Sequence, residues 1–275
     1  MKKIVVLTTF VSMCAVSAVE ASPITFLGTG SNVAGITGIR DDFRTAVGGG
    51  TVAGANGSFG GVRREINWDG VPDIFSAPNN MPANFFNVNS PRGAVFSTPG
   101  TGFQVSANAG VAPIEFDNIN ATYSATFGVF SPQRLFTAIG STITDVNFFV
   151  PGSATPALTS AFGAIFTDVD LTGSSIQYFD RLNNSLGLFS VPSLLGSETF
   201  SFLGVVFDSA VVSRVRIISG NAALGLNDGA GIDVAVMDDF LYAEPVAAVP
   251  EPATLILTGI GFAIVGLRIR RRTRG

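Results

Sequence analysis

The 275-residue sequence predicts an all-β fold, a jelly-roll-like β-sandwich flanked by an apolar helix at each end. Many short runs alternate apolar and polar residues or are rich in Phe, Val and Ile, and turn residues separate them roughly every 8–15 positions. No stretch shows a sustained apolar repeat of 3.6 residues, which would indicate an amphipathic helix. The 24 phenylalanines, against one tryptophan and three tyrosines, suit an interior between two sheets.

The amino terminus has the pattern of a secretory signal peptide. Lys2 and Lys3 precede an apolar run over residues 4–19, and small residues follow it. We expect signal peptidase to cleave after Ala21, with Ala18 as the second choice. The chain then divides into a signal peptide at 1–21, a β-sandwich domain at 22–246 and a carboxyl-terminal segment at 247–275.

The strand pattern is stronger in the second half of the predicted domain than in the first. Residues 29–61 are rich in Gly and Ala with little apolar patterning, so we expect long loops and one edge strand there. Within 211–219, apolar side chains share one face while Arg214 and Arg216 point to the other, as in a strand with one buried face. The six clearest strands are residues 162–169, 175–179, 186–191, 199–207, 211–219 and 233–242.

Composition excludes several kinds of chemistry. The chain has no histidine, and its single cysteine, Cys14, and its only lysines, Lys2 and Lys3, all lie in the predicted signal peptide. The domain therefore lacks the usual general base near neutral pH, a thiol nucleophile and a Schiff-base lysine. A thiolate metal site and a phosphate-binding P-loop are excluded for the same reason.

The predicted domain is acidic. Residues 22–245 contain nine arginines against eighteen aspartates and glutamates, a formal charge of −9. Such a surface disfavours nucleic acid as a partner, because the phosphate backbone is also negative. It favours cations, and calcium is the extracellular cation that oxygen-rich loops bind.

One oxygen-rich turn has a spacing that suggests calcium. Asn67, Asp69 and Asp73 surround Gly70, although the later Glu and the flanking helices of an EF-hand are absent. One interpretation is a structural Ca²⁺ that connects this loop to a second acidic strand end, Asp168–Asp170 or Asp238–Asp239. The alternative is an Asx-turn in which Asn67 and Asp69 bond local amides while Trp68 anchors the loop in the core.

The closing carboxylate of that calcium site is predicted to be Asp238 or Asp239, near the end of a long strand. Adjacent strand residues face opposite sides, so one of the two should point inward and need a cation, an arginine or a hydroxyl group as partner. A salt bridge to Arg63 or Arg64 is the alternative to a metal.

Catalysis would have to rest on a pair of carboxylates, as in glycoside hydrolysis. Glu65 and Glu198 are the glutamates best placed near predicted strands, with Asp168 and Asp170 as potential partners. Nothing in the sequence brings two of them together at the required separation. We therefore expect a protein without catalytic residues, with a secreted glycosidase or polysaccharide lyase as the alternative.

The carboxyl-terminal segment combines a stiff motif, an apolar stretch and a basic end. Pro250 and Pro252 hold Glu251 in extended geometry. Residues 253–267 carry no charge and would span about 22 Å as a helix, which predicts a short transmembrane segment. The stop-transfer residues that place its end in the cytoplasm are Arg268, Arg270, Arg271, Arg272 and Arg274.

This segment resembles the PEP-CTERM sorting signal of Gram-negative bacteria, which the membrane protease-transpeptidase exosortase reads. The Pro250-Glu251-Pro252 tripeptide, the residues that follow it, the Gly-rich apolar helix and the arginine cluster all match the pattern. The resemblance implies a transient anchor in the inner membrane, removal of the tail by exosortase, and a final location at the cell surface or outside the cell. Such proteins often occur in species that make exopolysaccharide.

The body also resembles exported proteins of this sorted class, over residues 60–73 and 161–242. Domains of this kind are usually taken to be carbohydrate-binding-like sandwiches. We therefore expect a non-catalytic component of the cell surface or extracellular matrix that binds an extracellular polysaccharide.

Overall fold

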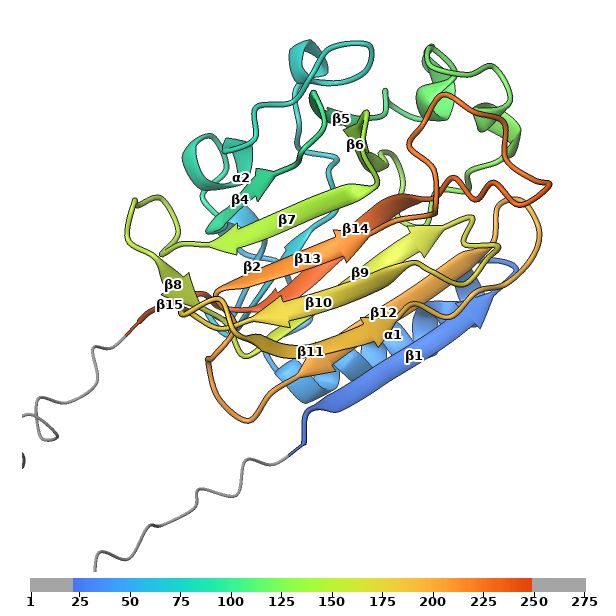
Figure 1. Ribbon diagram of the computed structural model, residues 1–275. Coiled ribbons are helices and arrows are strands. Elements are labelled where there is room, and N and C mark those ends of the chain that lie inside the picture. The colour runs from blue at the N-terminus through green and yellow to red at the C-terminus, as the bar shows by residue number, and fades with distance from the viewer. Residues whose placement is uncertain (1–21, 249–275) are drawn as a thin grey trace, which may run out of the picture.

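The computed structural model describes residues 22–248, which form two stacked antiparallel sheets (Figure 1). In pairing order, the larger sheet contains β1 (Ile24–Gly30), β12 (Phe200–Val206), β9 (Ala161–Thr167), β14 (Val236–Ala243), β3 (Arg63–Ile66) and β2 (Ser58–Phe59). It is extended by β6 (Phe136–Ile139), which pairs with β14, and by β5 (Gly102–Val105), which pairs with β6. The second sheet contains β11 (Ser185–Ser190), β10 (Ser175–Phe179), β13 (Arg214–Ile218), β7 (Ile143–Phe148) and β4 (Ala94–Ser97).

The remaining elements are short, apart from one helix. A two-stranded piece pairs β8 (Ala157–Leu158) with β15 (Val246–Ala247). The α-helices are α1 (Val33–Val47) and the single turn α2 (Phe85–Val88). Four 3₁₀ turns lie in the loops, at Ala55–Gly57, Asp73–Phe75, Ile114–Phe116 and Tyr123–Ala125. The protein is thus a mainly β sandwich, as the sequence predicts.

Phenylalanine fills the space between the two sheets, as its abundance predicts. Trp68 lies at the centre of this core, fully buried, and its ring stacks on Phe136 at 4.1 Å between centroids. The rings of Phe86 and Phe240 meet Trp68 edge-on, an arrangement that aromatic quadrupoles favour. The indole Nε1 donates a 2.7 Å hydrogen bond to the Asp238 carbonyl, so its one polar atom is satisfied. The prediction that Trp68 anchors its loop in the core is confirmed.

Helix α1 covers the outer face of the larger sheet, behind β1 and β12 in Figure 1. Ile36 and Phe43 on the helix pack against Ile165, Phe202 and other outward-facing residues of that sheet, which make a second core. Strands β9 and β14 are therefore buried on both faces along their whole length. Burial on both faces explains why the sequences of β9 and β14 are nearly continuous apolar runs.

The prediction of long loops at 29–61 is wrong for residues 33–47, which form helix α1. Asn32 caps it by accepting a 3.2 Å hydrogen bond from the Gly35 amide, and Gly48 ends it with a positive φ of 90°. Its apolar stripe is only four residues long, among glycines, threonines and charged residues, so the sequence signal is weak. The helix is stabilised by packing of this stripe against the sheet and not by its intrinsic helix propensity. The stripe consists of Ile36, Ile39, Phe43 and Val47.

Close approach of this helix depends on glycine in the strand beneath it. A Cβ on Gly204 of β12 would lie 2.5 Å from the Phe43 ring, closer than any real contact. The edge strand expected within residues 29–61 is confirmed as the short strand β2, which pairs with β3 at one edge of the larger sheet, while β1 precedes most of this region and forms the opposite edge.

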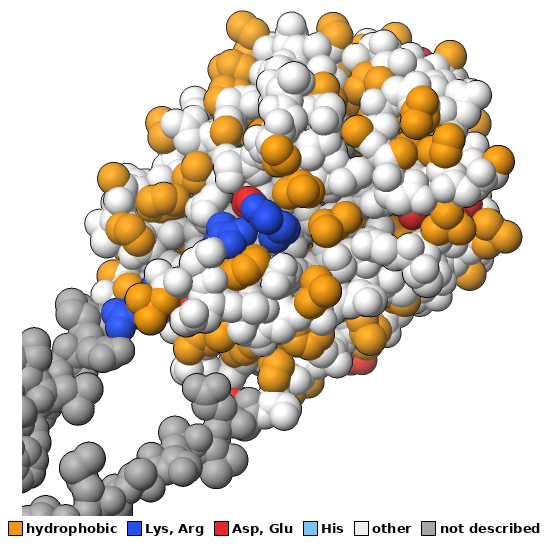
Figure 2. Space-filling model, in the orientation of Figure 1, with side chains coloured by type: hydrophobic (Ala, Val, Ile, Leu, Met, Phe, Trp, Pro, Cys, Tyr) orange, Lys and Arg blue, Asp and Glu red, His pale blue; other side chains and the backbone are white. Residues whose placement is uncertain are grey.

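All six strands predicted in the second half are confirmed within a few residues at their ends, as β9 to β14. In β13, Val215 and Ile217 are fully buried, while Arg214 and Arg216 lie on the outer face and bind Asp145 of β7. This outer face is the one in Figure 2, where basic side chains form a small group near the centre and appear again at the lower left, and hydrophobic side chains are scattered.

Within residues 22–248, no helix is long and apolar enough to cross a membrane. The predicted signal peptide at 1–21 and the predicted transmembrane segment with its arginines lie outside the described residues.

Candidate functional site: an arginine-lined cleft beside helix α1

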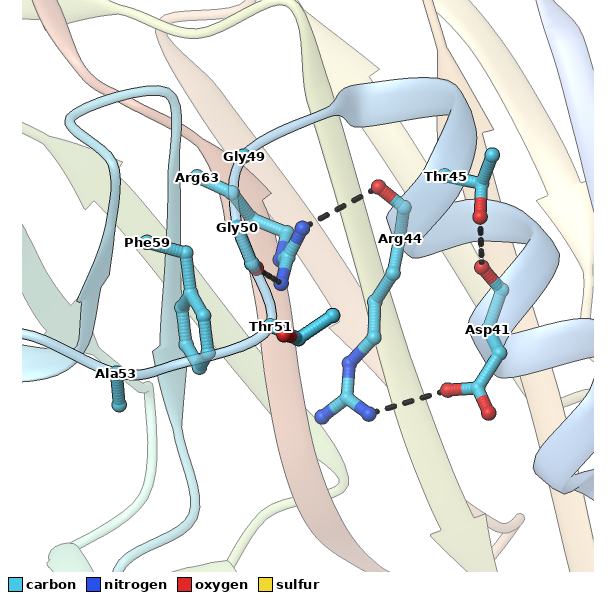
Figure 3. Close-up of a pocket in the computed structure, with 9 residues that line it drawn as sticks. All are labelled: Asp41, Arg44, Thr45, Gly49, Gly50, Thr51, Ala53, Phe59 and Arg63. Atoms are coloured by element: carbon cyan, nitrogen blue, oxygen red, sulfur yellow. Dashed lines mark hydrogen bonds and ion pairs between the residues drawn. The ribbon is translucent and has the colours of Figure 1, made fainter.

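A charged cleft lies between α1, the 49–59 loop and β3 (Figure 3). It consists of two cavities of about 540 and 330 Å³, whose linings share Arg44, Ala53 and Phe59. We call it the arginine cleft. Its main lining side chains are Asp41, Arg44, Phe59 and Arg63 in the larger cavity and Arg40, Glu65, Asn67, Arg92, Ser131 and Asp239 in the smaller one.

Glu65 of β3 is the centre of the ion pairs in the cleft. Arg44 of α1 binds its carboxylate through two nitrogens, at 2.8 and 2.6 Å. Arg63, two residues earlier on the same strand face, donates to the same carboxylate at 2.8 Å. Such bidentate, charge-assisted bonds are strong and fix geometry. The helix is thus tied to the strand at the wall of the cleft.

Arg63 also ties the loop after the helix to the strand. Its guanidinium donates to the carbonyl oxygens of Gly48 and Gly50 and lies over the Phe59 ring at 4.4 Å. Figure 3 shows the Arg63 guanidinium beside Gly50 of the loop, with dashed lines from Arg63 to the Arg44 carbonyl and from the Arg44 guanidinium to Asp41. With only 3% of its surface exposed, Arg63 is a structural member of the wall.

Arg92 differs from its neighbours because none of the carboxylates in residues 22–248 forms an ion pair with it. Its guanidinium donates one 2.5 Å hydrogen bond to the Glu65 backbone carbonyl and lies over the Phe86 ring. Its Nε is buried without a hydrogen-bond partner. Burial lowers the pKa of Arg92, but a guanidinium stays charged in any protein. The smaller cavity therefore has a positive wall that its own acids do not neutralise.

Asp239 lines the same cavity, and its neighbour Asp238 lies behind it. Both are buried, against the expectation that only one of the two would point inward, because a β-bulge shifts the register between Met237 and Phe240. The Ser131 hydroxyl reaches both carboxyl groups, at 3.1 and 2.6 Å. Burial and the charge of Asp239 raise the pKa of Asp238 well above its usual range, and burial raises that of Asp239.

The expected salt bridge from these aspartates to Arg63 or Arg64 is wrong. Arg63 pairs with Glu65, and Arg64 pairs with Glu244 at 2.8 Å. Both arginines lie on β3, where the glutamates are nearer partners than the bulge of β14. The hydroxyl partner that the sequence also allowed is the one the structure provides.

The residues of the predicted calcium turn have separate partners. The Asn67 amide donates to Asp69 at 2.8 Å, and Asp69 accepts the backbone amide of Gln133, which is 64 residues away. The Asx-turn alternative is therefore wrong in its partners, since Asp69 holds a distant loop. Asp73 lies at the surface and pairs with the buried guanidinium of Arg134.

Among residues 22–248, no three His, Cys, Asp or Glu side chains are arranged to hold a metal ion. The calcium prediction for Asn67, Asp69, Asp73, Asp238 and Asp239 stays a prediction, and their positions show what else they do. Asp69 and Asp238 both bind the segment after residue 129, because Asp238 accepts the amides of Phe130 and Ser131.

Of the four acids considered for catalysis, Glu65 alone lines the arginine cleft. Glu198 is exposed in the loop before β12, and Asp168 and Asp170 follow β9. Sequence reasoning did not find Arg44 and Arg92, which come from segments far from β3 in the chain. The available signal for Arg44 was the weak apolar stripe of helix α1, which ends at Val47.

Comparison with known families identifies the tail. Residues 248–272 match the model of the PEP-CTERM protein-sorting motif. The chain carries a PEP-CTERM sorting motif. The motif indicates an exported protein with exosortase as its processing partner, and Pro250, Glu251 and Pro252 lie within it. The match covers the tail and leaves the body unassigned.

No curated protein matches the chain. A crystal structure of the enzymatically active domain of bacteriophage CBA120 tailspike protein 4 is similar over 64% of this chain and 22% of that one, with 14% identity and a TM-score of 0.24. The PEP-CTERM chain thus spans about a fifth of that protein's length.

Proposed function

We propose that this PEP-CTERM protein is a non-catalytic component of the cell surface or extracellular matrix that binds an acidic polysaccharide in the arginine cleft. The observation that carries the proposal is Arg92, a half-buried cation at the wall of an open cavity without a carboxylate of its own. Guanidinium groups bind carboxylates in planar, two-bond geometry, so a uronic acid suits this position.

The other groups in the cavity suit a sugar. Asn67 and Ser131 offer an amide and a hydroxyl group, and Phe59 offers an aromatic face. A few polar groups in a partly apolar concavity are typical of a small-ligand site. The domain's net negative charge disfavours non-specific attraction of acidic polymers, which makes the local positive wall the feature that selects them.

An array of acidic and neutral glycans tests this proposal on the purified full-length protein. We expect binding to uronate-containing oligosaccharides such as oligogalacturonate and no binding to dextran. Equal binding to both would remove the role of the guanidinium groups, and binding to neither would remove the proposal.

The sorting part of the proposal concerns the tail. We propose that exosortase removes the tail from a transient membrane anchor and releases the body to the surface. Replacing Glu251 with Ala should leave the protein full length and in the membrane fraction of a host with exosortase. Normal release would show that the tripeptide is only a linker.

A second candidate function is hydrolysis of the bound glycan. Glu65 and Asp239 line one cavity, and the raised pKa of Asp239 suits a general acid beside an ion-paired carboxylate. New reducing ends from oligogalacturonate, lost in both Glu65→Gln and Asp239→Asn, would favour this function. Binding without new reducing ends favours the non-catalytic one.

A further inference from the structure

Four aspartates lie in neighbouring loops at the end of the sandwich where β9 stops. Asp168 and Asp170 follow β9 directly, and Asp228 and Asp233 belong to the long loop between β13 and β14. Burial raises the pKa of Asp168 to about 8, and the negative charges of the other three carboxylates contribute to this rise. We call this group the acidic end.

Asp168 is the unusual member. The residue is fully buried, and neither of its carboxylate oxygens has a hydrogen-bond partner. Its backbone lies in the left-handed region, at φ 65°, and its amide donates to the Thr199 carbonyl at 3.0 Å. A buried carboxylate without donors is costly, so the position calls for a proton or a cation.

The surrounding aspartates are held in place by the backbone. Asp170 accepts the Gly196 amide at 2.8 Å, Asp233 accepts the Asp170 amide at 3.0 Å, and Asp228 accepts the Val234 amide at 3.1 Å. These bonds connect the loop after β9 to the loop before β14. Burial raises the pKa of Asp228 and Asp233, and their bonds to backbone amides lower it in part.

We propose that the acidic end binds a divalent cation, with Asp168 as its central ligand and Asp170, Asp228 and Asp233 around it. Oxygen donors without histidine or cysteine suit a hard cation, and calcium accepts such irregular shells. In the structure, the four carboxylates are not grouped closely enough to hold a metal ion. Binding would therefore draw the loop that carries Asp228 towards Asp168, with backbone carbonyls completing the shell.

This site is distinct from the predicted calcium turn around Asn67 and from the arginine cleft, and it does not rest on glycan binding. The two explanations of Asp168 give opposite results for one variant. If a proton neutralises it, an amide at this position is harmless. If a cation does, the amide removes the central ligand.

Thermal melting of the full-length protein, in millimolar Ca²⁺ and in chelator, tests the proposal. We expect Ca²⁺ to raise the melting temperature of the wild type by about 5–10 °C at a hundredfold excess over Kd. Asp168→Asn should lose this response, and Asp42→Asn, which removes an exposed charge on α1, should keep it. An unresponsive wild type, or an Asp168→Asn protein that responds as the wild type does, overturns the proposal.

Terbium luminescence gives a direct second measurement that does not depend on stability. Tyr123 lies beside the loop, where its hydroxyl donates to the Leu226 carbonyl at 2.8 Å, so it can sensitise Tb³⁺ at this site. We expect Tb³⁺ emission from the wild type, displaced by Ca²⁺, and at least tenfold weaker binding in Asp228→Asn, which lies in the loop and should fold even if Asp168→Asn does not. Unchanged Tb³⁺ affinity in Asp228→Asn would contradict the proposal.

Discussion

In the arginine cleft Glu65 binds two guanidinium groups, whereas at the acidic end Asp168 faces three other aspartates. Five of the nine arginines of residues 22–245 lie in or beside the cleft, so more than half of the domain's positive charge is concentrated there. The cleft carries positive charge beyond what its own acids pair. The acidic end has the reverse imbalance.

The opposite charges of these two regions show that the net charge of a domain does not predict which ligand a particular surface binds. A formal charge of −9 suggests cations as partners, and this suits the acidic end. The same chain offers an anion the unpaired guanidinium of Arg92. Opposite ligands are therefore proposed for two regions of one domain.

The largest expected effect comes from breaking the ion pairs of the cleft. Glu65→Gln leaves the buried Arg63 without a carboxylate and leaves Arg44 with its pair to Asp41, and removing one partner of a buried pair costs about 3 kcal/mol or more. Urea unfolding measures this loss of free energy. Glu244→Gln removes a single ion pair, whose partner Arg64 is more exposed than Arg63; it is the control and should cost about 1 kcal/mol. Equal losses would show that Glu65 is not the centre of the wall.

A smaller loss of stability is expected when helix α1 is displaced from the larger sheet. Gly204→Ala places a methyl group against the Phe43 ring, and overpacking of this kind costs about 1–3 kcal/mol. Thermal melting checks the loss. Since α1 is one wall of the cleft, glycan affinity should fall as well, while the Ca²⁺ response of the acidic end should persist.

Gly38→Ala on the same helix is the matched control for Gly204→Ala. A Cβ there meets nothing within 4 Å, so the change should stabilise the helix by up to about 1 kcal/mol. A protein with Gly204→Ala that is as stable as one with Gly38→Ala would show that α1 tolerates displacement.

The smallest effect concerns a second pair of like charges, Glu115 and Glu198. Burial and then the charge of Glu198 raise the pKa of Glu115 to about 7 from 4.5. The folded state therefore holds a proton that the unfolded state releases, so stability should fall as pH rises from about 4.5 to about 7. Urea midpoints across this range should decline less in Glu115→Gln than in the wild type. Asp117→Asn, which removes an acid two residues away, is the control and should keep the wild-type slope.

The strands could be predicted because their pattern reflects burial. Strand β13 alternates as a strand with one wet face should, and β9 and β14 are apolar along their length because α1 and the second sheet cover both faces. The helix itself escaped prediction, since four apolar residues among glycines and polar residues give little periodic signal. Its stability comes from packing against the sheet, and Gly28 and Gly204 permit the close approach that this packing needs.

The site was harder to predict than the fold. The arginine cleft joins Arg44, Glu65, Arg92 and Asp239, which lie 21 residues or more apart, and only the tertiary structure brings them together. The β-bulge that turns both Asp238 and Asp239 inward leaves no mark in the strand pattern. The tail behaves differently, because Pro250, Glu251 and Pro252 are recognised as a linear motif.

The affinity of the full-length protein for oligogalacturonate, measured by calorimetry for the wild type, Arg92→Gln and Arg216→Gln, tests the central claim most directly. Losing a hydrogen-bonded charge pair costs about 1.5–3 kcal/mol, so Arg92→Gln should weaken binding about 10- to 100-fold. Arg216→Gln removes the same charge from the outer face of β13 and should bind as the wild type does. If the two variants bind equally well, the arginine cleft is not the glycan site.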